Sequence, residues 1–198
     1  MTITAEQVRQ LREQTGAGMM ECKKALAEAS GDVGKAIDLL RKAGIAKAEN
    51  RSGRAAAEGL VEAYIHPGSR VGVLIELNCE TDFVARTPEF GQLVRDLAMQ
   101  AAAAGADYVR REEVPVERVA REREIFRAQL EGQNKPANIL DKIVEGKLEK
   151  FYSEVCLLEQ PFIKDDSITV RDLIQAASSK TGENVVLKRF VRYLLGQD

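Results

Sequence analysis

The sequence predicts an α+β protein in which three short helices precede a core with a three-stranded antiparallel sheet and packed helices. Three observations lead to this prediction. The first fifty residues carry helix signals alone, the apolar period changes to two over residues 60–77, and the β-branched, aromatic segment "NVVLKRFVRYLL" follows at residues 184–195. Strands near the middle and the end of a chain, with helices between them, are typical of an α+β core.

The first fifty residues predict three helices around one small core. Thr4 and Gln7 have the spacing of a capping box, which marks the start of the first helix. "TGAG" at residues 15–18 ends that helix, Gly31 ends the second as a left-handed cap, and the third stops near Gly44. The apolar stripes expected to face the core are Val8 and Leu11, then Met19, Cys22, Leu26 and Ala29, then Val33, Ala36, Ile37 and Leu40. A unit this small suits a binding module better than a catalytic cavity.

A charged, Ala-rich segment follows, and residues 51–58 are expected to form a linker before the core. The period-two segments at residues 60–65 and 71–77 predict a β-hairpin. Pro67 and Gly68 between them suit the two central positions of a type II turn, because proline presets the first backbone angle and glycine accepts the positive second one.

Four further helices are predicted between the hairpin and the last strand. The first covers residues 88–105, with proline at its start and glycine at its end. Residues 115–132 form a charged helix with a thin apolar stripe, and residues 138–161 form a more strongly amphipathic one that Pro161 stops. A capping-box pattern opens the fourth helix at residues 169–182.

The composition favours a protein of the cytoplasm. The 29 basic and 31 acidic residues give a net charge of −2, which argues against the broad basic footprint of a general nucleic-acid binder. The segment up to Arg54 is mildly basic, which fits an acidic protein partner but is more simply a solvated helix surface. Cys22, Cys79 and Cys156 are far apart and are expected to be buried thiols in a reducing compartment. No signal peptide or membrane-spanning run is recognised.

The sequence offers little material for an enzyme. His66 is the single histidine and lies beside the Pro-Gly turn, with no nucleophile next to it. Asp165 and Asp166 could be paired carboxylates, but adjacent residues in "KDDS" more often make a turn. "TGAG" lacks the Gly-Lys-Ser/Thr end of a phosphate loop and follows a helix rather than a strand. We therefore expect no catalysis, no cofactor and no direct binding of a nucleotide or a metal.

Three motifs resemble one known family. "LREQTGAGMMECKKAL" at residues 11–26, "GVLIELNCETDFVAR" at 72–86 and "GENVVLKRFVR" at 182–192 are similar in order and spacing to bacterial elongation factor Ts. The resemblance covers nearly the whole chain and implies a guanine-nucleotide exchange factor for elongation factor Tu in translation elongation. This partner is the GTPase that carries aminoacyl-tRNA to the ribosome.

The resemblance also implies a division of the chain. Residues 1–50 would be a three-helix module, similar to ubiquitin-associated domains, that docks on the GTPase. Residues 51–58 would link it to an α+β core at residues 59–198. A helical hairpin would project from this core at about residues 116–158.

The segment from Thr81 to Val84 is implied to reach into the GTPase, and we call it the tip. In the family the Asp-Phe pair, here Asp82 and Phe83, inserts near the nucleotide, displaces a helix and disturbs magnesium coordination in elongation factor Tu; Thr81 and Val84 shape this element. From the residues alone, the alternative is that Phe83 and Val84 fold back into the core and Asp82 is a plain helix N-cap.

Arg12, Met19 and Met20 are implied contacts of the N-terminal module with the GTPase. The alternatives are a solvated arginine and a pair of core methionines. Adjacent residues of a helix cannot both face one core, so at least one methionine is expected to point outward.

The chain departs from longer relatives, which carry a duplicated core subdomain. With a single core, two copies could be needed to present two surfaces to the GTPase. A homodimer built on the amphipathic helices or the last strand is thus an open hypothesis. The rival functional class is an adaptor in which the three-helix module binds another protein or an RNA and the core is a scaffold.

Overall fold

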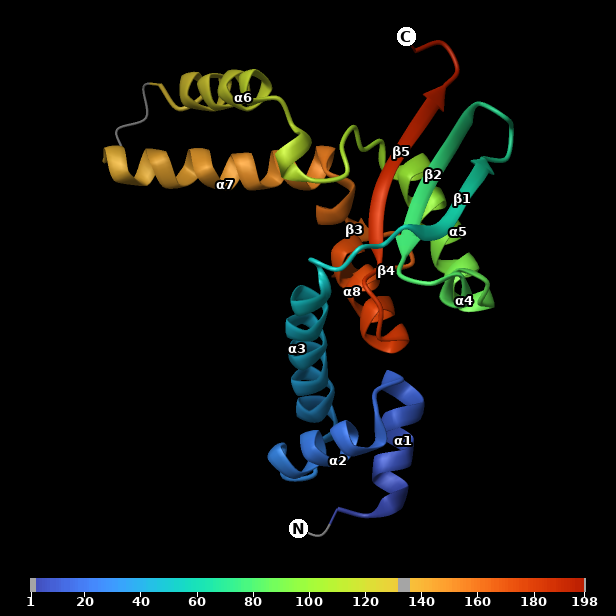
Figure 1. Ribbon diagram of the computed structural model, residues 1–198. Coiled ribbons are helices and arrows are strands. Elements are labelled where there is room, and N and C mark those ends of the chain that lie inside the picture. The colour runs from blue at the N-terminus through green and yellow to red at the C-terminus, as the bar shows by residue number, and fades with distance from the viewer. Residues whose placement is uncertain (1–2, 132–135, 198) are drawn as a thin grey trace. The chain divides into compact units, whose positions relative to one another are not determined.

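The computed structural model describes residues 3–131 and 136–197, apart from the side chains of residues 45 and 47–49, and confirms the α+β class (Figure 1). The chain forms two compact units. The first unit comprises Met1–Leu60, Leu77–Gly91 and Asp172–Val186, and the second comprises Val61–Glu76, Gln92–Arg171 and Leu187–Asp198.

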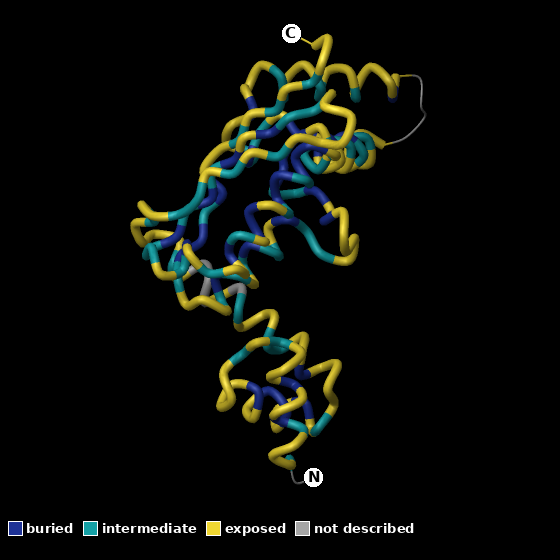
Figure 2. Tube along the Cα trace, turned by 90° about the vertical axis from the view of Figure 1, so that its right-hand side faces the viewer, coloured by how far each residue is buried: buried dark blue, intermediate teal, exposed yellow. Residues whose placement is uncertain are grey.

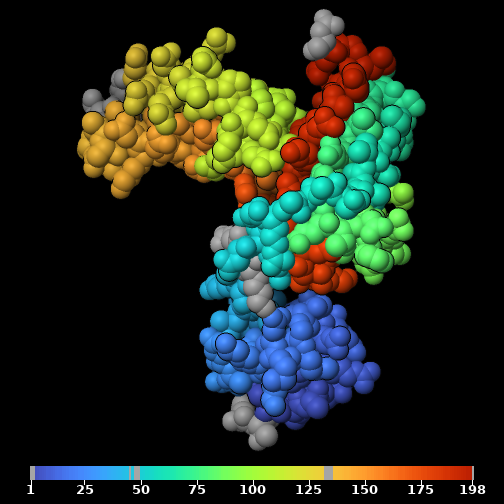
Figure 3. Space-filling view, viewed as in Figure 1, coloured from blue at the N-terminus to red at the C-terminus, as the bar shows by residue number. Residues whose placement is uncertain are grey.

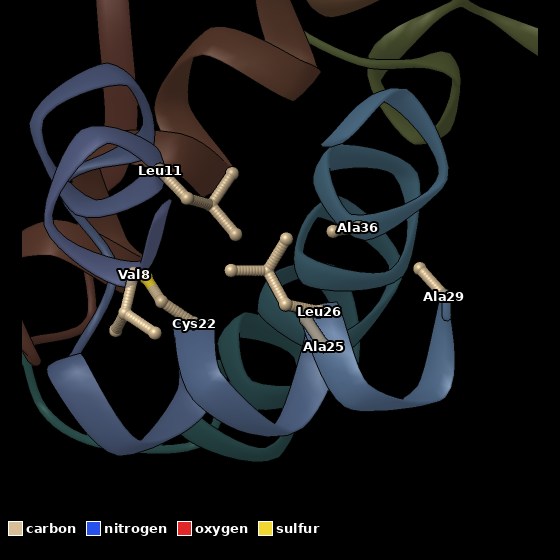
Figure 4. Packing of buried hydrophobic residues seen from close by; sticks show 7 residues of the cluster. All are labelled: Val8, Leu11, Cys22, Ala25, Leu26, Ala29 and Ala36. Carbon is tan, nitrogen blue, oxygen red and sulfur yellow. The ribbon is translucent and has the colours of Figure 1, made fainter. Parts of the chain in front are cut away.

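The first unit begins with three helices, α1 (Ala5–Thr15), α2 (Met19–Glu28) and α3 (Val33–Arg51). The capping box is confirmed, since the Gln7 N–H donates to Thr4 Oγ1 at 3.3 Å and the Thr4 N–H donates to Gln7 Oε1 at 3.0 Å. Buried residues occur on all three helices (dark blue in Figure 2), and their side chains form one core (Figure 4): Val8, Leu11, Cys22, Ala25, Leu26, Ala29 and Ala36.

Two expectations for these helices are wrong. Gly44 does not end α3, because a glycine inside a helix costs only about 1 kcal/mol and tertiary contacts stabilise the extension. One such contact is the hydrogen bond from Ser179 Oγ to the Gly44 carbonyl at 3.0 Å. Met19, Val33 and Ile37 were expected in the core but are 45 %, 41 % and 36 % exposed. Three short helices enclose too small a volume to cover the edges of their apolar stripes.

The predicted three-stranded antiparallel sheet is confirmed, with the order β1-β2-β5. Its strands are β1 (Glu58–Ile65), β2 (Val71–Cys79) and β5 (Val186–Leu194). An ion pair of 2.7 Å between Arg189 Nε and Glu76 Oε2 links the two longer strands. β2 is the central strand, and alternate residues along it are buried, as its period-two pattern predicts.

The turn between β1 and β2 also has the predicted chemistry. The Ser69 N–H donates to the His66 carbonyl at 2.9 Å, which closes a four-residue turn. Gly68 has a φ of 91°, the positive angle that the third position of a type II turn requires.

Helix α5 (Pro88–Ala104) lies against this sheet. Arg95 Nε pairs with Glu62 Oε1 on β1 at 3.5 Å, and Arg192 Nε on β5 donates to the Ala102 carbonyl at 3.3 Å. The helix presents a continuous buried stripe to the interior, made by Phe90, Leu93, Val94, Leu97, Ala98, Ala101 and Ala102.

The charged and amphipathic segments form an antiparallel helical pair in the second unit, α6 (Val116–Ala128) and α7 (Ala137–Val155) (Figure 1). Leu130, Val144 and Leu148 form a buried cluster between the two helices. The connection at residues 132–135, which the predicted hairpin includes, lies outside the described residues.

The structure differs from the sequence prediction beyond this pair. α7 ends at Val155 instead of reaching Pro161, since a 3₁₀ turn at Leu157–Glu159 follows. A small ribbon of β3 (Pro161–Phe162) and β4 (Asp165–Thr169) was not predicted, and Asp165 and Asp166 begin its second strand rather than forming the turn itself. Helix α8 (Val170–Thr181) then leads to β5.

Candidate partner-binding site

The tip residues start a single helical turn, α4 (Asp82–Ala85), between β2 and α5. Thr81 is its N-cap, and its Oγ1 accepts the Val84 N–H at 3.4 Å. The Phe83 side chain is 81 % exposed, so the interpretation of Phe83 as a core residue is wrong. α4 lies at the molecular surface (green in Figure 3), and it presents an aromatic ring to solvent.

Local contacts after the tip hold this turn closed. Thr87 Oγ1 donates to the Val84 carbonyl at 2.8 Å and accepts the Phe90 N–H at 3.2 Å, so Thr87 joins the end of α4 to the start of α5. Asp82 Oδ2 pairs with Arg86 Nη2 at 2.9 Å, but the arginine is 78 % exposed and such surface pairs are worth little. Asp82 is therefore the first helical residue and half-buried, not the cap.

A second set of contacts holds the residues before the tip. The Glu183 carboxylate, on the connection between α8 and β5, accepts three hydrogen bonds from Glu80 and Thr81. Cys79 is fully buried, and its Sγ donates to the Thr81 carbonyl at 3.2 Å. Burial and the Glu183 charge raise the pKa of the Cys79 thiol above its usual value, so the thiol stays a neutral donor. Sequence reasoning did not single out Glu183, although it lies inside the third family motif.

The predicted contacts of the N-terminal module are all at its surface. Arg12 is exposed in the last turn of α1, whose end is closed by Gly16 with a φ of 68°. Met19 and Met20 begin α2 and are 45 % and 73 % exposed, so the interpretation as a core methionine pair is wrong for both. Unbranched, polarizable methionines adapt to varied partner surfaces, which makes this helix start a candidate docking surface.

The second unit carries a separate apolar surface on one side of the sheet. Exposed large apolar residues occur on all three strands, at positions that alternate with residues contacting α5, such as Glu62 and Arg192. We call this surface the open sheet face, and its large apolar members are Val61, Ile65, Leu74, Val191 and Tyr193, with Leu195 just after β5. Exposed apolar groups gathered in this way mark an interaction surface more often than isolated ones do.

The sequence candidates for chemistry do not come together. His66 is exposed, and its Nδ1 lies 3.1 Å from the Tyr64 hydroxyl. Asp165 Oδ1 accepts hydrogen bonds from the Ser167 N–H at 3.1 Å and from the Ser167 hydroxyl at 2.6 Å, within β4. Over residues 3–131 and 136–197, no group of three or more His, Cys, Asp or Glu side chains is placed to hold a metal ion. Cys22, Cys79 and Cys156 are free thiols and buried, as predicted. None of the described helices is both long enough and apolar enough to cross a bilayer.

Comparison with known proteins finds relatives of one family. The sequence model of the family described as Elongation factor TS matches residues 1–197. The chain is 60 % identical over 195 residues to elongation factor Ts of Carboxydothermus hydrogenoformans, which covers 98 % of this chain and 90 % of the relative. It is 60 % identical to that of Moorella thermoacetica over 98 % of this chain and 96 % of the relative. It is 54 % identical to elongation factor Ts of Thermodesulfovibrio yellowstonii over 100 % of this chain and 98 % of the relative.

Proposed function

The chain belongs to the elongation factor Ts family, the nucleotide exchange factors of elongation factor Tu, and on that premise we propose that it promotes GDP release from this GTPase during translation elongation in the cytoplasm. The observation that carries the proposal is the 81 % exposure of Phe83 on a capped helical turn. A ring displayed in this way packs little against its own chain and is available to a partner. An exchange factor makes and breaks no covalent bond, so the site needs contacts and not catalytic groups.

In the proposed mechanism, the tip inserts beside the nucleotide and disturbs magnesium coordination in the partner. Thr81 caps the turn, Asp82 and Phe83 enter the partner, and Val84 supports them. Burying a phenylalanine contributes about 1.5–3 kcal/mol, which corresponds to roughly ten- to a hundredfold in affinity. By reciprocity, the bound nucleotide lowers the affinity of the GTPase for the factor by the same ratio as the factor lowers its affinity for the nucleotide. A large acceleration therefore requires a second contact that supports the tip.

We assign that second contact to the N-terminal module. Arg12, Met19 and Met20 are exposed around the junction of α1 and α2, and they combine a cation with flexible apolar groups. Arginine and methionine are both enriched at protein interfaces, where their long side chains bury much surface. The extra binding energy from this contact pays for the opening of the nucleotide site.

The open sheet face is proposed as the interface of a homodimer. Apolar residues on all three strands give it the composition of an interface core, and a two-fold axis would pair this face with itself. Two copies of the chain would then present two core surfaces, as longer relatives with a duplicated core do from one chain.

The function is tested by the release of fluorescent GDP from elongation factor Tu, followed by stopped flow with and without this chain. We expect release to accelerate with factor concentration and to saturate. If the chain bound elongation factor Tu, or an RNA, without accelerating GDP release, the adaptor hypothesis would replace the exchange function.

A further inference from the structure

We propose that Glu183 is a positioning residue for nucleotide exchange: its carboxylate holds the Glu80–Thr81 backbone and so sets the direction in which Phe83 points. This inference rests on the proposed function. It assigns a role to a residue that lies outside the tip, on the connection between α8 and β5.

The first observation is that Glu183 uses both carboxylate oxygens on the residues next to the tip. Its Oε2 accepts the Glu80 N–H at 3.0 Å and the Thr81 N–H at 3.1 Å. Its Oε1 accepts the Thr81 hydroxyl at 2.6 Å. Hydrogen bonds to an ionised carboxylate are about twice as strong as neutral ones. Thr81 is also the N-cap of α4, so Glu183 holds the residue from which the turn starts.

The second observation is a return contact in the opposite direction. The Glu80 carboxylate accepts the Asn184 N–H at 2.6 Å and lies 3.4 Å from Arg54 Nη1. Each glutamate thus binds the backbone next to the other, which fixes both sliding and rotation between the two segments. A single hydrogen bond would leave the rotation free.

The connection that carries Glu183 is itself firmly held. Ser178 Oγ donates to the Glu183 carbonyl at 2.6 Å. Asn184 is 5 % exposed, and its Nδ2 donates to the Arg54 carbonyl at 2.8 Å. Arg51, the last residue of α3, donates to the Ser178 carbonyl at 3.2 Å. The glutamate therefore transmits the position of a rigid support, and this support includes the end of the helix that leaves the N-terminal module.

The need for such a support follows from the size of α4. A helix of four residues does not stabilise itself, because the first turn fixes several backbone angles for one hydrogen bond. Phe83 is 81 % exposed, so packing does not orient it either. Its direction in the free chain depends on Thr81 and Thr87 at the two ends of the turn, and Glu183 controls the first of these.

The test compares Glu183→Ala and Glu183→Gln with a matched control. Glu113→Gln is suitable, because Glu113 also accepts a backbone N–H (Val109, 2.9 Å) and an arginine (Arg110, 2.9 Å), but in the second unit. We expect Glu183→Ala to lower the saturating rate of GDP release about tenfold, as the loss of a charge-assisted hydrogen bond would. Glu183→Gln should rescue part of this loss, and the control should match wild type.

A double-mutant cycle with Phe83→Ala separates positioning from a merely structural role. If Glu183 acts through Phe83, Glu183→Ala should cause less than about a twofold further loss once the ring is absent. If the double variant lost as much rate as the product of the two single losses, the proposal would be overturned. A wild-type saturating rate in Glu183→Ala would overturn it as well. If the wild-type chain did not accelerate GDP release from elongation factor Tu, the proposed function would be wrong. The orientation of the tip by Glu183 would then be tested by the next measurement, which does not need the partner.

The chain contains no tryptophan, so Phe83→Trp introduces a single indole at the tip, whose fluorescence can be excited selectively over that of the four tyrosines. In this background, Glu183→Ala should lower the steady-state anisotropy of the indole, while Glu113→Gln should leave it unchanged. The melting temperatures of all variants are measured alongside, and the comparison is made well below the lowest one. Unchanged anisotropy in folded Glu183→Ala would show that the carboxylate does not orient the tip, and this would overturn the inference.

Discussion

Phe83→Ala is expected to separate function from stability. The ring is 81 % exposed, so its removal takes little apolar surface out of the folded core and leaves no cavity. Replacing a buried phenylalanine would cost about 3–5 kcal/mol. Here we expect a change in unfolding free energy of about 0.5 kcal/mol or less, as for other surface substitutions.

The effect on exchange should be much larger. If the whole ring is buried in the partner, its loss removes about 1.5–3 kcal/mol of interface energy. The second-order rate of GDP release should then fall roughly ten- to a hundredfold, since about 1.4 kcal/mol corresponds to a factor of ten. Part of this fall should appear at saturating factor, because the ring is proposed to act on the nucleotide site and not merely to add affinity.

Two measurements on the same preparation check this prediction. Stopped-flow release of fluorescent GDP gives the rate as a function of factor concentration, and thermal unfolding gives stability. Val116→Ala is the matched control, since Val116 is another apolar residue that is 78 % exposed, at the start of α6. We expect both variants to melt within about 2 °C of wild type and only Phe83→Ala to exchange slowly. A large drop in melting temperature, or a wild-type release rate, would refute the reasoning.

Four further predictions follow from other parts of the molecule. Excess chelator should shrink the fold-acceleration of GDP release at saturating factor, because magnesium removal already does part of what the tip is proposed to do; an unchanged ratio would mean that the tip acts elsewhere on the nucleotide site. Met20→Ala should weaken binding to elongation factor Tu several-fold in a titration, with a circular dichroism spectrum like that of wild type, because the side chain is 73 % exposed; unaltered affinity would remove Met20 from the docking surface. Tyr193→Asp should give the mass of one chain in light scattering at micromolar concentration where wild type gives two, since it places a charge on the open sheet face; a wild-type mass of one chain would contradict the homodimer. Burial raises the pKa of the Cys156 thiol from 9.0 to about 11, so its stabilising contribution is complete below pH 9 and is lost as the pH rises towards 11; denaturant unfolding from pH 8 to 11 should show a steeper loss in wild type than in Cys156→Ala, and equal slopes would refute this assignment.

Much of the fold could be predicted because its signals are local. The Thr4–Gln7 capping box and the type II turn before Ser69 each close within three residues, so a short stretch of sequence specifies them completely. The two hairpin strands follow from their period-two pattern in the same way, and the last strand follows from its β-branched and aromatic residues. The motif around Phe83 pointed to a functional role, but the residues alone left its exposure open, since an apolar residue in a connection can also fold inward.

The sequence by itself determined the existence of the longer helices, the hairpin and the family to which the chain belongs. Only the tertiary structure decided that α3 continues past Gly44, that Met19 lies outside the small core, and that Glu183 supports the tip. The hydrogen bond between Glu183 and Thr81 joins residues that are 102 positions apart, and no pattern of neighbouring residues predicts such a pair. Local hydrogen bonds and apolar periods involve residues that are close in the sequence, whereas burial and long-range polar contacts depend on which surfaces the folded chain brings together.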